Sequence, residues 1–248
     1  MKRIITAAAL LAVSALSANA ADLAARPYSK APPMMMEPVY NWTGFYLGAH
    51  VGGVWARSTV TDLNGYAALA GAGTETRVRR ESIFGGGQIG YNWQAGNWVF
   101  GIEADGGYMG LNRSVLLTGT TSGTQIGLRD VAYGDITGRL GYAWGPTMIY
   151  GKGGYAVMED PSRFSTVTGV FTGRSDRSAV SGYTVGGGVE YKFSPNWSAK
   201  VEYLHFDFGR DPSYSINGGT FNFRQDLRLD TVKVGVNYMW GGPVVARY

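Results

Sequence analysis

The stretch Leu229–Trp240 reads LDTVKVGVNYMW and has two chemically different faces. From Thr231 onward the odd-numbered positions are mostly small or polar, whereas the even-numbered positions are all apolar or aromatic. Successive side chains of a β-strand leave opposite faces, so this alternation predicts a strand that separates two environments. Its apolar face ends in the aromatic pair Tyr238 and Trp240.

The same aromatic ending recurs along the chain. The segments GGGQIGYNW, ITGRLGYAW and GGGVEYKF close at Trp93, Trp144 and Phe193, and with Trp240 these ends are 51, 49 and 47 residues apart. A repeated strand design predicts one all-β architecture. Eight strands are expected near residues 42–57, 81–93, 98–111, 130–144, 148–158, 179–193, 197–208 and 229–240.

The composition agrees with many closely approaching strands. The chain of 248 residues contains 38 Gly and 16 Tyr, and only 16% of its residues are charged. It has no cysteine, which excludes a disulfide framework.

The first residues carry the pattern of an export signal. Lys2 and Arg3 precede the apolar run 4–16, and Ala18 and Ala20 are the small residues that a signal peptidase reads, so cleavage is expected after Ala20. The expected organisation is a signal peptide at 1–20, a Pro-rich periplasmic leader at 21–40, a barrel at 41–240 and a tail at 241–248. Without Lys2 and Arg3 the excess of basic residues is small, so the charge gives no reason to expect a nucleic-acid partner.

Short and long connections alternate strictly between the expected strands. The short ones are 94–97, 145–147 and 194–196, and the long polar ones are 58–80, 112–129, 159–178 and 209–228. In an antiparallel meander all short turns therefore lie at one end and all long loops at the other. Outer-membrane barrels show this asymmetry, with short periplasmic turns and long extracellular loops.

The two strand faces indicate that the apolar side is outside. Aromatic residues next to the short turns would form a girdle at the membrane interface, namely Tyr91, Trp93, Trp98, Tyr142, Trp144, Tyr191, Phe193, Trp197, Tyr238 and Trp240. Charged residues of both signs share the opposite face and would pair inside the lumen, namely Glu103, Asp105, Asp135, Arg139, Lys152, Glu190, Lys200, Glu202 and Lys233. A secreted soluble sandwich or lipocalin-like barrel is the alternative.

Several segments together resemble one family. The segment NWTGFYLGAHVGGVW after the Pro-rich leader, GIEADGGY, YGKGGYA, VEYLHFDFG and the closing KVGVNYMW are similar to the opacity-type, outer-membrane-protein-A-like small β-barrel porins, in their alphaproteobacterial surface-antigen branch. The resemblance implies an eight-stranded antiparallel transmembrane up-and-down barrel in the bacterial outer membrane. It also implies a terminal aromatic residue that the barrel assembly machinery reads, and both Trp240 and Tyr248 fit that role.

The sequence gives little reason to expect a catalytic site or a cofactor-binding site. Gly85, Gly87 and Gly90 match the dinucleotide fingerprint, but no helix is expected after them, so no cofactor is predicted. No metal site is predicted either, because cysteine is lacking and no His and carboxylate cluster has ligand spacing. His50 is expected to be a polar lumen residue. His205 and Asp207 share a face, yet no serine can be assigned to them as a nucleophile.

The leading hypothesis is therefore a non-enzymatic structural and surface-interaction protein, because eight strands leave an interior that side chains fill. Its loops would meet a host surface or an antibody. Arginines in the loops suit the phosphates of lipopolysaccharide, namely Arg77, Arg79, Arg80, Arg163, Arg174, Arg177, Arg210, Arg224 and Arg228.

Two other functions stay open at this point. A narrow porin would use the space left by inner glycines, namely Gly86, Gly90, Gly101, Gly186, Gly188 and Gly235. An enzyme that modifies outer-membrane lipid would need His205 or Asp207.

Overall fold

The structure is a computed structural model that describes residues 40–65, 71–116, 125–160, 162–165, 179–216 and 221–240. The expected signal peptide, all of the Pro-rich leader except Tyr40, and the tail with Tyr248 lie outside the described residues. Within the described part, no helix is long and apolar enough to cross a membrane.

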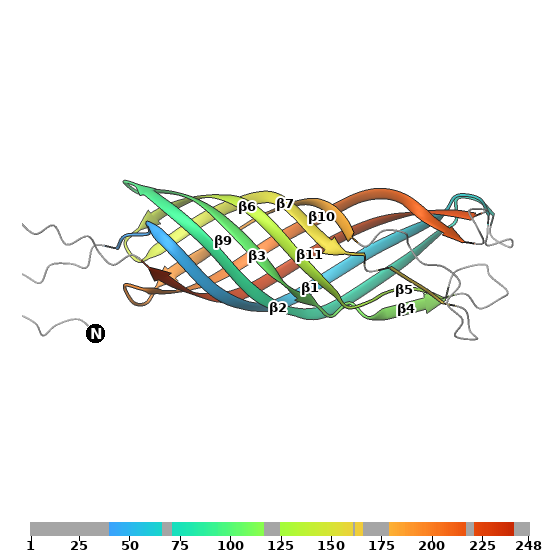
Figure 1. Ribbon diagram of the computed structural model, residues 1–248, viewed down its shortest axis with the longest axis horizontal. Coiled ribbons are helices and arrows are strands. Elements are labelled where there is room, and N and C mark those ends of the chain that lie inside the picture. Colours follow the sequence, from blue (N-terminus) through green and yellow to red (C-terminus); the bar gives the residue numbers. More distant parts are fainter. Residues whose placement is uncertain are drawn as a thin grey trace, which may run out of the picture. The chain divides into compact units, whose positions relative to one another are not determined.

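Eight antiparallel strands close into a barrel, which confirms the predicted fold class (Figure 1). Their order around the barrel is β1, β11, β10, β9, β7, β6, β3 and β2. The bounds are β1 Gly44–Asp62, β2 Glu75–Ala95, β3 Trp98–Met109, β6 Val131–Trp144, β7 Thr147–Glu159, β9 Ala179–Lys192, β10 Trp197–Ile216 and β11 Phe221–Trp240. β1 pairs with β11 over 18 register positions from Phe45 to Asp62, so the first and the last strand of the chain close the barrel.

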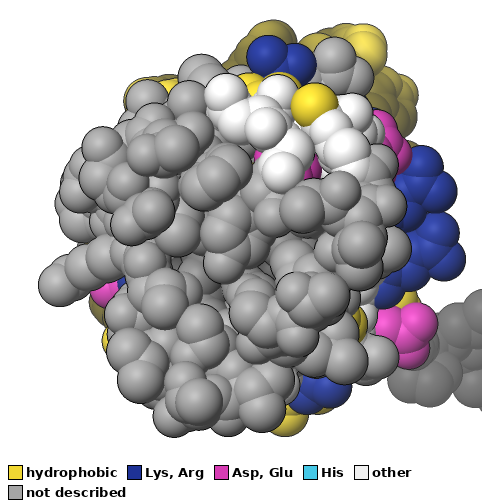
Figure 2. All heavy atoms as spheres, turned by 90° about the vertical axis from the view of Figure 1, so that its right-hand side faces the viewer, with side chains coloured by type: hydrophobic (Ala, Val, Ile, Leu, Met, Phe, Trp, Pro, Cys, Tyr) yellow, Lys and Arg dark blue, Asp and Glu magenta, His cyan; other side chains and the backbone are white. Residues whose placement is uncertain are grey.

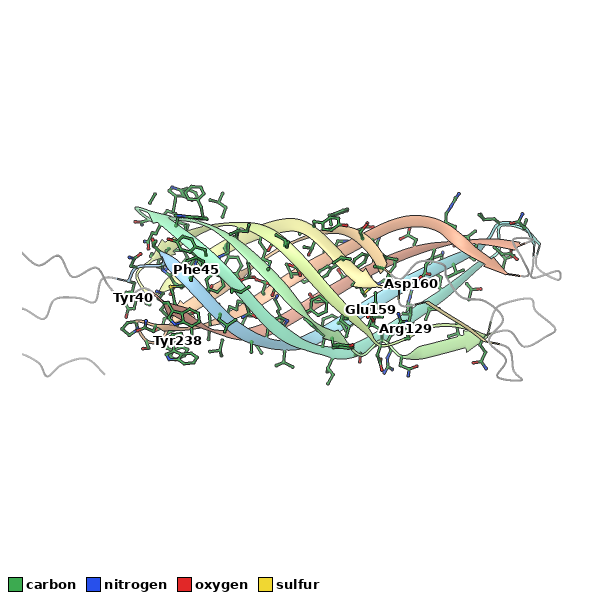
Figure 3. All side chains as sticks on the ribbon, viewed as in Figure 1. Tyr40, Phe45, Arg129, Glu159, Asp160 and Tyr238 are labelled. Atoms are coloured by element: carbon green, nitrogen blue, oxygen red, sulfur yellow. The ribbon has the colours of Figure 1, made fainter. Side chains whose placement is uncertain are left out.

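Three short turns join strands at one end of the barrel. They connect β2 to β3, β6 to β7, and β9 to β10, as the sequence predicts. Gly96 and Gly145 have φ values of 61° and 59°, a left-handed conformation that glycine adopts without steric cost. Tyr40, Phe45 and Tyr238 mark this end at the left of Figure 3.

The opposite end differs from the prediction, because two of the expected loops begin and end as strand. β1 continues to Asp62 and β2 begins at Glu75, whereas β10 reaches Ile216 and β11 begins at Phe221. In this part the alternation is inverted: Val60 and Val78 are buried, and Thr59 and Arg77 face outward. An inverted pattern is what a sheet needs where water replaces lipid outside the wall, since its apolar residues must then turn inward.

The two remaining loops contain a second, smaller sheet. It consists of β4 Arg113–Leu116, β5 Gln125–Leu128 and β8 Ser162–Ser165. β5 pairs with β8 from the next long connection, so two segments predicted as separate loops hydrogen-bond to each other. Arg129, Glu159 and Asp160 lie at the base of this region in Figure 3, where the Nε atom of Arg129 donates to the Asp160 carbonyl oxygen at 2.9 Å.

The barrel interior has three layers. An apolar cluster fills the loop half and includes Phe84, Leu204, Phe206 and Phe223. The turn end holds a second apolar cluster around Trp42 and contains the side chains Tyr46, Val99, Ala143, Met148, Tyr150 and Met239. Charged and polar side chains lie between the two clusters. The inward apolar residues of β10, which break the alternation seen in the sequence, therefore belong to the upper cluster.

Candidate functional site

The central feature of the interior is a buried carboxylate, Glu103. Its Oε1 atom lies 2.6 Å from the Nζ atom of Lys152, and its Oε2 atom lies 3.0 Å from the Nζ atom of Lys200. Arg139 adds a longer contact of 3.6 Å to Oε2, and the hydroxyl of Tyr46 donates to the same oxygen at 2.8 Å. One carboxylate thus holds three cations from three different strands.

A second group of ion pairs surrounds Asp105 and Glu202. The Nζ atom of Lys233 lies 2.7 Å from Asp105 and 2.9 Å from Glu202. Lys152 contacts the same two carboxylates at 2.9 and 3.3 Å, and the hydroxyl of Tyr150 donates to Glu202 at 2.7 Å. Lys152 therefore bridges this group to Glu103.

Arg139 and Glu190 form the third group. The Nη1 atom of Arg139 lies 3.2 Å from Glu190, its Nε atom donates to Asn92 at 2.8 Å, and its guanidinium carbon lies 4.7 Å from the ring centroid of Tyr46. Asn237 donates to Glu190 at 2.8 Å. Planar guanidinium groups combine ion pairing and ring stacking in this way.

The structure places all nine predicted lumen charges in the interior and brings eight of them into one network. The exception is Asp135, which is buried and lies opposite Asp105 on the neighbouring strand. Neither of its carboxylate oxygens has a hydrogen-bond partner among the described residues. An unpaired buried carboxylate is energetically costly.

Sequence reasoning missed the neutral members of this network. Tyr46, Tyr150, Asn92 and Asn237 complete the contacts of the ions. A further buried cation, Lys192, was also missed; it lies outside the network, 4.9 Å from the ring centroid of Trp42. The inward parity of all five follows from the alternation, but the sequence prediction named nine charged residues and none of these five.

The inner glycines do not leave open space. A Cβ atom on Gly90 would lie 2.2 Å from the Tyr46 hydroxyl oxygen, and one on Gly101 would lie 2.4 Å from the Asn92 side-chain oxygen. At Gly86 and Gly186 the backbone oxygen of the neighbouring strand occupies the position, at 2.1 and 2.0 Å. The argument that these glycines leave room for a pore is therefore wrong, because neighbouring groups occupy the positions.

The two histidines have separate structural environments. His50 lies in the interior between Gln88 and Tyr133, and its Nε2 atom is 2.6 Å from the Tyr133 hydroxyl. His205 faces outward and contacts Asp230 at 2.8 Å, not Asp207. Asp207 instead accepts a hydrogen bond from Arg228 at 3.2 Å.

The glycine fingerprint and the possible metal ligands also show no sign of a binding site among the described residues. Gly85, Gly87 and Gly90 all lie within β2, which continues as strand to Ala95. Within the described residues no group of three or more potential metal ligands is found.

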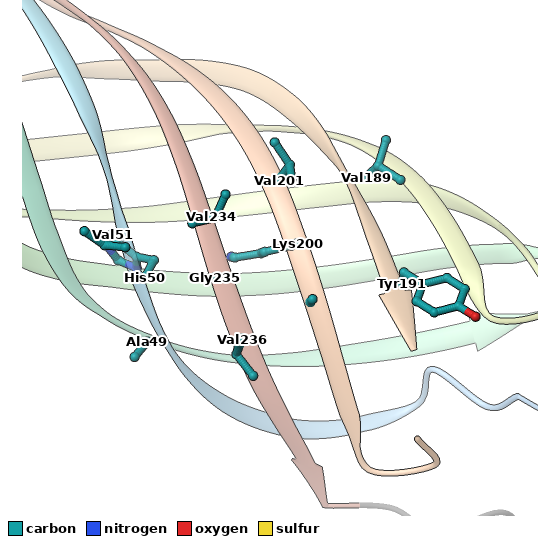
Figure 4. A pocket seen from close by; sticks show the side chains of 11 residues that line it. Ala49, His50, Val51, Val189, Tyr191, Lys200, Val201, Val234, Gly235 and Val236 are labelled. Atoms are coloured by element: carbon teal, nitrogen blue, oxygen red, sulfur yellow. The ribbon is translucent and has the colours of Figure 1, made fainter. Parts of the chain in front are cut away.

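The outer surface below the loop end is apolar. Val51, Ile102, Ile136, Val201 and Val234 are all about half exposed or more. The side chains of Ala49 and Ala199 flank Val236 in one cross-strand row, and this leaves a groove of about 680 Å³ (Figure 4). A surface of this kind suits hydrocarbon chains and not water.

The predicted aromatic girdle lies on this outer surface at the turn end. Eight of its members are exposed side chains, and Tyr91 and Tyr238 are partly buried among other rings. Trp98 and Tyr142 meet edge to face at 5.3 Å between centroids, as do Trp197 and Tyr238 at 5.0 Å. Phe45 on β1 contacts Tyr91 at 4.5 Å and extends the row, although it was not among the predicted members.

A closed eight-stranded barrel with an apolar outside, an aromatic rim and a charged interior defines the class of transmembrane β-barrels. The family model for the outer membrane protein beta-barrel domain matches residues 8–239 of this chain. The chain belongs to that family, and it is a protein of the bacterial outer membrane.

Named relatives of this chain are also outer-membrane proteins. The chain is 31% identical to the 31 kDa outer-membrane immunogenic protein of Brucella melitensis, over 96% of this chain and 99% of that protein. It is 30% identical to the 22 kDa outer membrane protein of Rhizobium leguminosarum, over 82% and 81%. Among solved structures, the outer membrane protein OprG from Pseudomonas aeruginosa is similar with a TM-score of 0.46 and 15% identity, over 80% of this chain and 97% of that one.

Proposed function

We propose that this barrel is a non-catalytic structural protein of the outer membrane that also displays its loop end as a surface antigen. The observation that carries the proposal is the filled interior. Ion pairs occupy the middle of the barrel, and apolar side chains lie above and below them. A wall that encloses packed side chains adds rigidity to the envelope, whereas a solute channel needs a continuous aqueous path.

The surface role is supported by the relatives. The Brucella melitensis relative is named an immunogenic protein, and the described loop-end parts of β1, β2 and β11 carry polar outward faces beyond the apolar surface. Antibodies against the loop end should label intact cells, and a deletion strain should become more sensitive to detergent and to chelators. Normal resistance of the deletion strain would contradict the structural role.

The partners we propose are outer-membrane lipids with lipopolysaccharide, the barrel assembly machinery during insertion, and a host surface or antibody at the loops. The described strand end Trp240 is exposed at the turn end, which suits a residue read during assembly. Replacement of Trp240 by Ala should slow assembly more than replacement of Trp55, an exposed aromatic residue far from the strand end.

Planar-bilayer recording tests the proposal against a narrow porin. The folded barrel should give no stable conductance steps. Reproducible single-channel steps would establish a continuous water path and overturn the sealed-interior assignment. Lipid A extracted from the deletion strain should also have an unchanged mass, since the site around His205 has no assigned nucleophile.

A further inference from the structure

The outward face of the barrel changes from apolar to charged at one level on three neighbouring strands. On β1 the last apolar outward residue is Trp55, and the register places Asp230 of β11 and Glu81 of β2 directly opposite it. From Phe45 to Trp55 a strand tilted by about 40° rises roughly 25 Å, which is the height of the apolar band of an outer-membrane barrel. This level is therefore the outer edge of the hydrocarbon layer.

Three arginines lie side by side in the next outward row. Arg57 of β1 is the direct register partner of Arg228 on β11 and of Arg79 on β2. All three are exposed, with 68% of the Arg57 side chain and 51% of the Arg228 side chain accessible. Like charges directly opposite each other on adjacent strands destabilise a sheet, so a bound anion would offset the repulsion in this row.

Acidic neighbours use only a small part of the hydrogen-bonding capacity of this row. Among the described residues, Arg57 has one ion-pair contact, of 3.7 Å with Asp230. Asp230 also accepts a hydrogen bond from Tyr203 and contacts His205. Arg228 uses its Nε atom for Asp207 and Asp226. Glu81 lies on the same outward face, below Arg79 and nearer the apolar surface.

The two outward arginines of β2 near this level differ in their ion pairing. One row above Arg57, Arg77 is paired with Glu75 at 3.1 Å. Arg79 has no ion pair with the described residues, and each guanidinium offers five N–H donors. Most donors of the row therefore have no partner among the described residues and can serve a ligand outside the wall. Basic side chains stand out from the wall at this end of the barrel (Figure 2).

We infer that the row Arg57, Arg79 and Arg228 binds a phosphate group of a phosphorylated glycolipid of the outer leaflet, of the lipid A type. Its acyl chains would lie against the apolar wall below, and its phosphate would lie at the level of the guanidinium groups, which bind phosphate with paired donors. The inference rests on the proposed lipid partnership and assigns it to the barrel wall instead of the loop tips.

The test uses the full mature protein, folded in micelles, and native mass spectrometry to count bound lipid. Diphosphorylated lipid A, its dephosphorylated form and phosphatidylglycerol are offered separately. The variant R57Q/R79Q/R228Q is compared with R77Q/R129Q/R224Q, which makes the same change of charge at arginines outside the row. The row variant should lose at least about tenfold in affinity for diphosphorylated lipid A, and the control should lose less than about twofold.

Each other outcome contradicts the inference. Equal losses in both variants would show general charge attraction, equal binding of the dephosphorylated lipid would exclude the phosphate, and equal binding of phosphatidylglycerol would exclude glycolipid recognition. Heat-dependent gel mobility checks that each variant is folded. If the triple variant does not fold, R57Q alone should still weaken binding by about threefold, and R77Q alone should not.

Failure of this inference is distinguishable from failure of the proposed function. A row variant with normal lipid A binding, together with a detergent-sensitive deletion strain, would contradict only the phosphate site. Lost binding in the row variant, together with a fully resistant deletion strain, would contradict only the structural role.

Discussion

The Nζ atom of Lys152 lies 2.6 Å from the Oε1 atom of Glu103, and neither side chain is accessible to solvent. Among the described residues this is the shortest contact between opposite charges in the barrel interior, and both residues have further partners. Such partners stabilise ions inside a barrel, because an isolated buried charge costs several kcal/mol.

Removal of Glu103 should therefore destabilise the barrel strongly. In the variant Glu103→Ala, Lys152, Lys200 and Arg139 lose a shared carboxylate, and the free energy of unfolding should fall by about 3–5 kcal/mol. Urea unfolding in lipid vesicles, followed by tryptophan fluorescence, measures the change. Glu81→Ala on the exposed outer face is the control and should change stability by less than about 1 kcal/mol.

Asp135 should behave in the opposite way. Because its carboxylate has no hydrogen-bond partner among the described residues, Asp135→Asn should leave stability unchanged or raise it by about 1–3 kcal/mol. Asp105 lies directly opposite Asp135. The variant Asp105→Asn should lower stability, since Lys152 and Lys233 lose a counter-ion. A large loss of stability in Asp135→Asn would reveal a partner that the described contacts do not contain.

The packing around Tyr46 can be tested at a glycine. A methyl group on Gly90 would collide with the Tyr46 hydroxyl, so Gly90→Ala should cost about 1–3 kcal/mol and displace Tyr46 from Glu103. Gly138→Ala is the matched control, because nothing lies within 4 Å of the added atom. Equal stability of the two variants would mean that the interior at Gly90 is not tightly packed.

The lipid-facing side should tolerate no charge at its middle. Val234 is exposed and lies directly opposite Val51, near the centre of the apolar band. Val234→Arg should destabilise the inserted barrel by about 2–4 kcal/mol, whereas Thr59→Arg, above the apolar surface, should cost less than about 1 kcal/mol. A spin label at Val234 or Ile102 should likewise report hydrocarbon, and a signal from water would place the wrong face outside.

Much of the fold was predictable from local patterns. The period of two in Leu229–Trp240 and its relatives identified the strands, and the short turns fixed their antiparallel order. The loop ribbons were not predicted, because apolar residues such as Val60 and Val78 turn inward there and the pattern reverses without any change in its period. The pairing of β5 with β8 joins two loops, and neither loop contains a local signal for the other.

The interior was only partly predictable. Parity assigned charges such as Glu103 and Lys233 to the correct face, but the choice of partner depends on the stagger between distant strands. Lys200 reaches Glu103 across 97 residues of sequence. The space that Tyr46 needs is supplied by Gly90 on β2, a relation that becomes visible only once the register is known.

The seam between β1 and β11 has a consequence for biogenesis. Lys233 and Asn237 arrive on the last strand and supply a cation for Asp105 and Glu202 and an amide for Glu190. Until that strand docks, these anions lack part of their neutralisation, and afterwards apolar layers isolate them on both sides. Closure of the barrel by β11 and neutralisation of these buried carboxylates thus occur in the same step. Intermediates that lack β11 are therefore destabilised, which favours insertion of the barrel as one cooperative unit.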